Sequence, residues 1–425
     1  MATDIYQPTA LLGGLSPKRF MRTHWQKKPL LVREAFPNFK PPISIGQVLK
    51  LCSHELAESR MITQEGKSKR WNLQHGPFDQ KEIPSVHDPR WTVLVQQVNT
   101  LLPEADRFLD HFRFVPEARL DDLMISVAGP DGGIGAHLDS YDVFLVQAAG
   151  KRRWEVSETV DPTLVPNVPL KILKNFKAQH DWVLEPGDML YLPPGVAHRG
   201  TAVGPGCMTW SIGFRAPGRV SLADSVWGHH IDTLQDCDWR DPWLSATDTP
   251  GEIPKKLIKA LAKQVQDSLP GRKTIERGIA CVLSEPAPAA VFEPPAKPDS
   301  LAVFSRKIAK TGLRLAPASR LLYLKGKFYF NGEEIELGLP RPEGPRNDGL
   351  SSLPRPAQDT PSLRGAAYDT PSLRGPKARG NPPDLEQLAN TRALSPTACA
   401  SLEAAHKNFV YRAFLNGWIR YDCGR

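Results

Sequence analysis

The chain has 425 residues, of which 40% are hydrophobic and 24% are charged, and its formal net charge is +8. Such a chain can bury a sizeable core, which excludes a wholly disordered protein, and its length fits two or three domains. No stretch approaches the run of about 18 apolar residues that a membrane-spanning helix needs, and the N-terminus lacks the pattern of a secretory leader, so we expect a cytoplasmic protein. Six cysteines lie far apart without a C-x-x-C pair, which argues against a disulfide framework or a zinc site.

The excess positive charge is confined to the C-terminal part of the chain. Residues 301–425 hold 19 Lys and Arg against 11 Asp and Glu, whereas the first 300 residues are balanced. Residues 301–330 carry seven basic side chains and no acidic one. A basic appendage on a neutral body favours a polyanionic partner such as nucleic acid or a ribonucleoprotein, although a solvated face has the same composition.

The first 220 residues change from a mixed pattern to an all-strand pattern. A helix is predicted around residues 17–26, followed by a short strand at 29–32 and a helical stretch after Ile45. Between residues 121 and 220, short apolar runs are broken by Gly and Pro, which is typical of a sandwich or barrel. The Ala149-Gly150 pair between two of these runs predicts a hairpin turn.

The remainder is predicted to be helical at first, and then a small mixed module follows a linker. Residues 255–266 place their apolar side chains on one face of an amphipathic helix within a helical region over 221–283. Residues 285–298 form a Pro-rich linker that we expect to be extended. A strand pair over residues 321–337 and a closing helix over 401–417 indicate a winged-helix arrangement.

An internal repeat interrupts the last module. The segment DTPSLRG occurs at residues 359–365 and again at 369–375, inside a stretch rich in Pro, Arg and Gly from about 340 to 383. Two copies are too few for a solenoid, and this composition cannot form a core. We therefore expect a disordered insertion produced by local duplication rather than a binding motif.

The sharpest chemical signal is the pair His137 and Asp139 in the sequence GGIGAHLD. On a strand, alternate residues share a face, so the imidazole and the carboxylate would lie side by side. A third ligand is expected from another strand, and His198 follows a Pro/Gly turn in LEPGDMLYLPPGVAH. Two His and one Asp form the facial triad of non-haem Fe(II) enzymes, which leaves positions open for a 2-oxo acid and dioxygen. H-x-D alone is common and usually carries no function, but the downstream His element in an all-strand region favours an iron site.

A 2-oxoglutarate co-substrate needs a fixed cation for its distal carboxylate, because a buried carboxylate without a partner is costly. Period-two alternation puts Arg152 on one face of its strand and Lys151 and Arg153 on the other. The pattern alone leaves open which face points inward. Ser126 could donate a hydroxyl to the same carboxylate, although a small strand residue without function fits that position equally well.

The remaining histidines and one core cysteine are weaker candidates. His229 and His230 are adjacent, so their side chains diverge and a shared metal is not expected. His180 is expected at the surface and His24 in N-terminal packing. Cys207 lies on a predicted core strand and is interpreted as a buried thiol.

Residues 121–217 resemble a JmjC-type double-stranded β-helix oxygenase, and the motifs are similar to those of the bacterial ribosomal oxygenases. The similarity is carried by DDLMIS, GAHLDSYDVFLVQ, GKRRWEV, LEPGDMLYLPPGVAH and SIGFRAP, with HWQKKPLLV and HGPF further upstream. The resemblance implies that the His-Asp-His triad binds iron and that Arg152 and Ser126 contact 2-oxoglutarate, which would point Arg152 inward. The long Pro/Arg-rich insertion departs from the family pattern.

The same resemblance implies the fold class and the domain plan. The expected fold is α+β, with a double-stranded β-helix (jelly-roll or cupin-like) catalytic core, N-terminal α/β additions, a helical dimerisation segment and a C-terminal winged-helix-like module. We place the oxygenase domain with its N-terminal elaboration at residues 1–217, with a core at about 104–217. The helical dimerisation segment and linker follow at 218–299, and the basic module with its insertion at 300–425.

Together, the triad and the resemblance imply an Fe(II)- and 2-oxoglutarate-dependent hydroxylase of an arginine in a large-subunit ribosomal protein, acting as a homodimer. One alternative is another cupin-type metal enzyme, which more often carries H-x-H and needs no Arg152. A second is a demethylase of methylated lysine, which shares the chemistry but not the flanking motifs. A third is a non-catalytic binding module that uses the basic C-terminus, on the ribosome or its RNA; the intact triad argues against it. The residues themselves do not choose arginine over the histidine that relatives oxidise.

Overall fold

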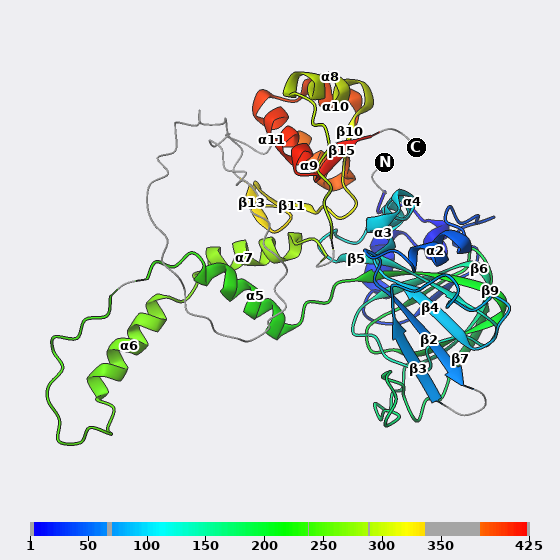
Figure 1. Cartoon of the computed structure of the whole chain (residues 1–425), viewed down its shortest axis with the longest axis horizontal. Helices are drawn as coiled ribbons and strands as arrows, with labels where there is room; N and C mark the ends of the chain where they lie inside the picture. Colours follow the sequence, from blue (N-terminus) through cyan, green and yellow to red (C-terminus); the bar gives the residue numbers. More distant parts are fainter. Residues whose placement is uncertain (1–3, 66–69, 237, 288–289, 336–382, 423–425) are drawn as a thin grey trace.

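The structure is a computed structural model that describes residues 4–65, 70–236, 238–287, 290–335 and 383–422 (Figure 1). The DTPSLRG repeat and the predicted insertion, apart from Pro383, lie outside the described residues. Within the described part of the chain, no helix is both long and apolar enough to cross a membrane.

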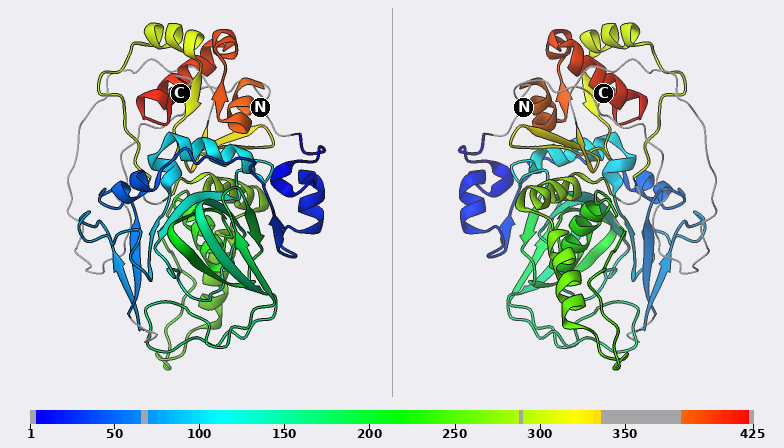
Figure 2. Two further views of the ribbon diagram at one scale, coloured as in Figure 1. Left: turned by 90° about the vertical axis from the view of Figure 1, so that its right-hand side faces the viewer. Right: turned by 90° about the vertical axis from the view of Figure 1, so that its left-hand side faces the viewer.

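Among the described residues, nine antiparallel strands form one large sheet, which Figure 2 shows curled into a barrel. The sheet order is β1-β8-β6-β9-β5-β4-β2-β3, with β7 paired to β6. The strands are β1 (Leu30–Val32), β2 (Ser59–Glu65), β3 (Arg70–His75), β4 (Trp91–Val95), β5 (Leu120–Ala128), β6 (Val143–Ser157), β7 (His180–Leu184), β8 (Met189–Leu192) and β9 (Ala197–Phe214). The predicted all-strand region is confirmed, although β6 and β9 are longer than the sequence pattern indicated.

The predicted hairpin turn at Ala149-Gly150 is wrong. β6 runs on through these residues and pairs with β9 on both sides of them, with register shifts around Ala149. Gly150 has a φ of +60°, and a Cβ there would lie 2.8 Å from the carbonyl oxygen of Gly206. A glycine in this conformation forms a bulge that bends a long strand instead of reversing it. The same strand therefore continues to Arg152.

Short helices cover the outer side of the sheet. They are α1 (Pro17–Thr23), α2 (Ile45–Leu51), α3 (Val98–Leu101) and α4 (Pro103–Phe108), with 3-10 turns at Ala10–Leu12 and Leu109–Phe112. Two of these helices start at a serine cap: the Ser16 side chain accepts a hydrogen bond from the backbone N–H of Arg19, and Ser44 forms a capping box with Gln47.

Alternation along the strands separates the core from the barrel interior. On β4, Val93 and Val95 pack into the main hydrophobic core with the helices, whereas Thr92 and Leu94 line an internal cavity. On β9, Trp210 belongs to the core, and its ring packs edge-to-face on Phe108 at 4.7 Å between centroids. The period of two thus gives the sheet one face for packing and one for a site.

A helical segment follows the barrel and contains α5 (Arg219–Ile231), α6 (Lys255–Asp267) and α7 (Arg272–Ser284). The predicted amphipathic helix is confirmed as α6, which stands away from the other elements in Figure 1. None of its residues is buried, and Ile258 and Val265 are 53% and 62% exposed.

The C-terminal module comprises the described residues 301–335 and 383–422. Its elements are α8 (Leu301–Thr311), β10 (Leu313–Leu315), β11 (Leu321–Leu324), β12 (Lys327–Phe330), β13 (Glu333–Ile335), α9 (Pro383–Thr391), β14 (Ala393–Leu394), α10 (Pro396–Ser401), α11 (Ala404–Leu415) and β15 (Ile419–Tyr421). The predicted strand pair is part of a three-stranded meander, β11-β12-β13, and the predicted closing helix is confirmed as α11, with the separate short helix α10 before it. The winged-helix assignment stays a prediction.

Ion pairs use much of the positive charge of residues 301–330. Five of the seven basic side chains pair with carboxylates, most of them far away in the sequence: Lys307 with Asp299, Arg314 with Asp106 and Asp110, Arg320 with Asp121, Lys325 with Glu276, and Lys327 with Glu334. The composition of residues 301–330 could not reveal these partners, because all of the carboxylates lie outside that range.

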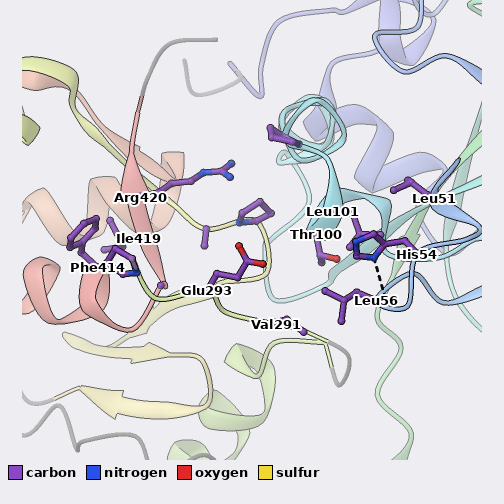
Figure 3. Close-up of a pocket in the computed structure, with 15 residues that line it drawn as sticks. Leu51, His54, Leu56, Thr100, Leu101, Val291, Glu293, Phe414, Ile419 and Arg420 are labelled. Carbon is purple, nitrogen blue, oxygen red and sulfur yellow. Dashed lines mark hydrogen bonds between the residues drawn. The ribbon is translucent and has the colours of Figure 1, made fainter. Parts of the chain in front are cut away.

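A cavity of about 460 Å³ lies between the barrel part and the C-terminal module (Figure 3). Leu51 and His54 line it on one side, and Phe414 and Arg420 on the other. Among the described residues, this cavity contains no group of three metal-ligating side chains.

Candidate active site

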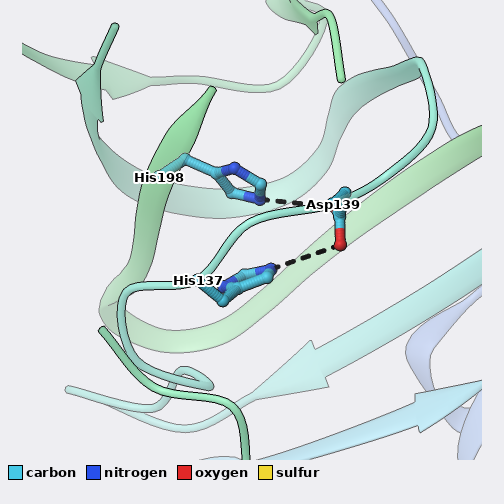
Figure 4. A group of neighbouring side chains, drawn as sticks. All are labelled: His137, Asp139 and His198. Atoms are coloured by element: carbon cyan, nitrogen blue, oxygen red, sulfur yellow. Dashed lines mark ion pairs between the residues drawn. The ribbon is translucent and has the colours of Figure 1, made fainter. Parts of the chain in front are cut away.

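The three side chains predicted as iron ligands lie together in the barrel interior (Figure 4). One ligand atom from each of His137, Asp139 and His198 lies within 4.8 Å of the others. The Asp139 carboxylate is 3.5 Å from Nε2 of His198 and 4.0 Å from Nε2 of His137. Within the described residues this is the one cluster of three such side chains, and its donor set and spacing fit a single divalent metal.

The chain brings these residues together differently from the predicted strand. His198 lies at the start of β9, after the turn that follows β8, as predicted. His137 forms only an isolated bridge, in which the two histidines exchange backbone hydrogen bonds of 3.0 Å, and Asp139 follows in a loop. Gly135, with a φ of +82°, turns the chain into this bridge.

Backbone carbonyls fix the orientation of both imidazoles. Nδ1 of His137 lies 3.0 Å from the carbonyl oxygen of Gly135, and Nδ1 of His198 lies 3.0 Å from that of Val196. With Nδ1–H donating to the carbonyl, each Nε2 keeps its lone pair toward Asp139. Burial and the neighbouring His137 lower the pKa of His198 to about 3, so this ring is neutral and able to bind a metal.

Burial also raises the pKa of the Asp139 carboxyl above its ordinary value. The buried carboxylate is therefore costly in the absence of a cation, and a divalent ion between the three side chains would offset that cost.

Arg152 lines the same cavity, which has a volume of about 400 Å³. Its side chain points inward, with the residue 4% exposed, while Lys151 and Arg153 pair with carboxylates on the outside of the barrel. Nη2 of Arg152 is buried and has no hydrogen-bond partner among the residues that the structure describes. A buried guanidinium with a free N–H fits the distal carboxylate of a 2-oxo acid.

Two hydroxyls lie in the cavity with this guanidinium. Ser126 is 5% exposed, and its Oγ donates only a long hydrogen bond of 3.5 Å to the carbonyl oxygen of Thr209. Thr92, on the adjacent strand β4, has a buried Oγ1 that finds no hydrogen-bond partner in the described part of the chain. The sequence analysis missed Thr92, because a single threonine in the apolar run WTVLV carries no motif, and only the pairing of β4 with β5, which sets Thr92 opposite Ala128, brings it to the cavity that Ser126 also lines.

An acidic side of the cavity was also missed. Asp121 and Asp122 line it at the start of β5, together with Tyr141 and Arg60. Oδ2 of Asp122 accepts a hydrogen bond of 2.9 Å from the backbone N–H of Gln97, and burial raises the pKa of Asp122 to about 6. The two aspartates belong to the motif DDLMIS, but nothing in the sequence indicates that they face the cavity.

The weaker candidates lie elsewhere. Nε2 of His229 is 3.7 Å from Glu285, and Nε2 of His230 is 2.8 Å from the carbonyl oxygen of Ser268, so the two rings have different neighbours. His180 is exposed and lies on β7, as expected for a surface residue. His24 stacks on Phe20, as expected for N-terminal packing.

Known proteins are similar to this chain in both sequence and fold. Residues 107–222 match the JmjC domain family. The chain is 32% identical over 339 residues to the ribosomal protein uL16 3-hydroxylase of Escherichia coli (strain K12), covering 78% of this chain and 88% of that protein. It is 34% identical over 215 residues to a probable ribosomal oxygenase of Haemophilus influenzae, covering 50% of this chain and 52% of that protein.

A solved structure of YcfD, a ribosomal oxygenase from Escherichia coli, in complex with cobalt and 2-oxoglutarate is also similar. It superposes with a TM-score of 0.73 at 26% identity and covers 96% of this chain and 98% of that one. The similarity therefore extends beyond the barrel, through the helical segment and into the C-terminal module.

Proposed function

This chain belongs to the JmjC ribosomal oxygenases, and we propose that it is an Fe(II)- and 2-oxoglutarate-dependent hydroxylase of an arginine in a large-subunit ribosomal protein. The observation that carries the proposal is Nη2 of Arg152, which has no hydrogen-bond partner within the described ranges and is buried in the cavity that also contains the His-Asp-His cluster. A 2-oxo acid oxygenase requires a metal site and, in the same cavity, a cationic group that can bind a carboxylate.

In this proposal, the residues of the chain hold and orient the reactants. His137, Asp139 and His198 would hold Fe(II), and the backbone carbonyls beside Nδ1 of the two histidines keep each Nε2 available. Arg152 would pair with the distal carboxylate of 2-oxoglutarate, and the hydroxyls of Ser126 and Thr92 would donate hydrogen bonds to that carboxylate. The bound metal and co-substrate supply, with dioxygen, the oxidising power that inserts one oxygen atom into an unactivated C–H bond and releases succinate and carbon dioxide.

The acidic side of the cavity supports a cationic substrate. The raised pKa of Asp122 indicates that the negative charge of its carboxylate is poorly compensated. A guanidinium bound beside it would compensate that charge. Tyr141 lines the same cavity, and aromatic side chains attract cations. These contacts favour arginine over histidine as the target.

The alternatives fit this cavity less well. A cupin enzyme that uses no 2-oxo acid leaves the buried Arg152 without a ligand, which is costly. A non-catalytic module gives no reason to gather three metal-ligating side chains in the barrel interior. A lysine demethylase uses the same iron chemistry, so the product on the substrate is the distinguishing measurement.

We also propose that the chain is a homodimer formed through its helical segment. The apolar side chains Ile258 and Val265 on α6 and Val220 and Ile231 on α5 are between 53% and 82% exposed in the single chain. Exposed apolar area of this kind favours a protein partner, and a second copy is the one that the family resemblance implies. Ile258→Glu with Val265→Glu is expected to give monomers by light scattering, whereas Lys259→Glu on the same helix leaves the dimer intact. A wild-type chain that is monomeric at all concentrations would reject this arrangement.

Contact of the C-terminal module with the ribosome or its RNA stays a prediction. Because so many of its basic residues are paired, that contact would depend on others such as Arg306 and Lys310. Action on a ribosomal protein is consistent with the predicted cytoplasmic location.

The test of the main proposal is a reaction of the full chain with Fe(II), 2-oxoglutarate, dioxygen and a peptide of the ribosomal protein. We expect succinate formation that the peptide stimulates and a gain of one oxygen atom on arginine by mass spectrometry, both lost in His137→Ala. Turnover of 2-oxoglutarate without a change in peptide mass would reject the substrate but keep the oxygenase. Absence of iron binding and of turnover would reject the enzyme.

A further inference from the structure

The strand that carries the acidic side of the cavity begins with a β-bulge. β5 and β9 pair at Leu120 with Phe214 and next at Leu123 with Ile212, so β5 has one residue more than its partner between these pairs. The extra residue lies in the Asp121-Asp122 segment. Bulges redirect side chains and leave backbone groups without ladder partners. The conformation of this segment, and with it the direction of Asp122, therefore depends on contacts from outside the strand pair.

One of these contacts comes from the C-terminal module, about 200 residues away in the chain. Arg320 donates hydrogen bonds from Nη1 to the carbonyl oxygen of Leu120 at 2.6 Å and from Nη2 to that of Asp121 at 2.9 Å. Arg320 is 7% exposed. A planar guanidinium can span two successive carbonyl oxygens, which a lysine ammonium cannot do with the same geometry.

The other side of the bulge is held within the barrel part. The side-chain oxygen of Asn99 accepts a hydrogen bond of 2.9 Å from the backbone N–H of Leu123, and the backbone N–H of Gln97 donates to Asp122 at 2.9 Å. Gln97, just before α3, and Asn99, in α3, thus hold the bulge on one side, and Arg320 holds it on the other.

The module holds Arg320 rigidly in place. Arg392, 2% exposed, donates from its guanidinium to the carbonyl oxygens of Ser319 at 2.7 Å and Ala316 at 2.9 Å, which fixes the loop before Arg320. The backbone N–H of Arg320 donates to Asn331 Oδ1 at 2.8 Å. Because these groups are buried and bonded, the position of the Arg320 guanidinium is set by the fold of the module.

We propose that the C-terminal module is a positioning element of the substrate site: through Arg320 it fixes the bulge of β5 and thereby directs Asp122 into the catalytic cavity. The inference rests on the proposed function, in which Asp122 receives the guanidinium of the substrate. Arg320 lies behind the strand and acts on the substrate only through the bulge.

The experiment compares full-length variants in binding a peptide that carries the target arginine and a matched peptide with neutral citrulline in its place. Binding is measured with Mn(II) and 2-oxoglutarate under argon, and 2-oxoglutarate affinity is measured separately. Arg320→Ala and Arg320→Lys remove the two-carbonyl contact. Arg314→Gln is the matched control, because it removes another arginine of the same junction, one that is partly buried and pairs with Asp106 and Asp110.

We expect the wild-type chain to prefer the arginine peptide, and both Arg320 variants to reduce that preference by about tenfold, since small displacements of a binding group cost this much or more. Affinity for 2-oxoglutarate stays unchanged, and Arg314→Gln keeps the preference even if its melting temperature falls. Hydrogen exchange of the backbone at residues 120–124 is expected to rise in Arg320→Lys, which tests the bulge directly even if Arg320→Ala does not fold. An unchanged preference and unchanged exchange in Arg320→Lys would overturn the role of the module. A wild-type chain without any preference would instead reject Asp122 as the receptor, and the inference with it.

Discussion

The Nε–H of Arg152 donates a hydrogen bond to Sγ of Cys207 at 3.4 Å, beneath the proposed co-substrate pocket. The Nε2 of Gln147 donates to the same sulfur at 3.5 Å, and Oγ1 of Thr209 donates to Oε1 of Gln147 at 3.0 Å. All four side chains are buried. Since a thiol is a weak acceptor, Cys207 orients the guanidinium without neutralising its charge, which remains available for a carboxylate.

Cys207→Ala is expected to weaken 2-oxoglutarate binding by about three- to tenfold, the effect of losing one modest hydrogen bond. Cys207→Asp is expected to abolish binding, because a carboxylate would then occupy the guanidinium. Titration of 2-oxoglutarate against the intrinsic fluorescence of the Mn(II)-loaded protein measures both, and Trp154, whose ring lies 5.7 Å from the Arg152 guanidinium carbon, is a suitable reporter. Cys52→Ser, which changes a buried thiol at the C-terminal end of α2, is the control. Wild-type affinity in Cys207→Asp would contradict this role.

Two neighbouring arginines provide a test of the inward face of β6. Arg152→Gln removes the buried charge and is expected to raise the dissociation constant of 2-oxoglutarate by roughly 100-fold, since charged partners of a buried carboxylate are worth several kcal/mol. Arg153→Gln removes an exposed charge that pairs with Asp181 and is expected to leave binding unchanged. Calorimetry with Mn(II) present gives both values. Equal losses in the two variants would show that general positive charge, not the cavity, attracts the co-substrate.

The features that sequence could predict are those encoded by local spacing. Motif spacing nominated His137, Asp139 and His198, and alternation separated Arg152 from its neighbours, because a strand repeats every two residues. Gly150 was misinterpreted because its positive φ serves a bulge as readily as a turn, and the local sequence does not distinguish them.

The features that sequence could not predict depend on long-range pairing. Thr92 reaches the cavity because β4 lies beside β5, and Asp122 does so because of a bulge held by Arg320. The charge excess of residues 301–330 indicated a free basic surface, but a composition count cannot show that Arg314 is partly buried against distant carboxylates and Arg320 is buried against distant carbonyls.

The His-Asp-His cluster predicts that substitutions of two different histidines change the response to added metal differently. His198→Ala removes a buried ring from the cluster, so addition of Co(II) is expected to give neither a visible absorption band nor a rise in melting temperature. His180→Ala removes an exposed ring that lies near Glu158, and the Co(II) response is expected to match that of the wild-type chain. A response in His198→Ala of wild-type strength would place the metal elsewhere.

Asp122→Asn is expected to stabilise the fold while impairing substrate binding. Burial raises the pKa of Asp122 from 3.8 to about 6, so at neutral pH the folded chain holds an ionised carboxylate that the unfolded chain accommodates more easily. Each unit of such a shift corresponds to about 1.4 kcal/mol, and the variant should therefore be more stable than the wild type by about 1–3 kcal/mol at pH 7. Asn keeps an oxygen that can accept the hydrogen bond from the Gln97 N–H.

The pH dependence separates this explanation from a simple change in packing. The penalty is absent below pH 3.8, where both states bind the proton, grows as pH rises, and is complete above about pH 6. The stability advantage of Asp122→Asn, measured by urea unfolding, should accordingly grow from pH 4 to pH 6 and then level off.

Binding of the arginine peptide to the wild-type chain should weaken below about pH 6 as Asp122 takes up a proton, whereas the weak binding of the variant should not follow that titration. Asp121→Asn, whose side chain is 48% exposed, serves as the control for loss of a charge at the same bulge. A variant that is less stable at neutral pH, or one that binds arginine and citrulline peptides as the wild-type chain does, would show that Asp122 is not the receptor of a cation in this cavity.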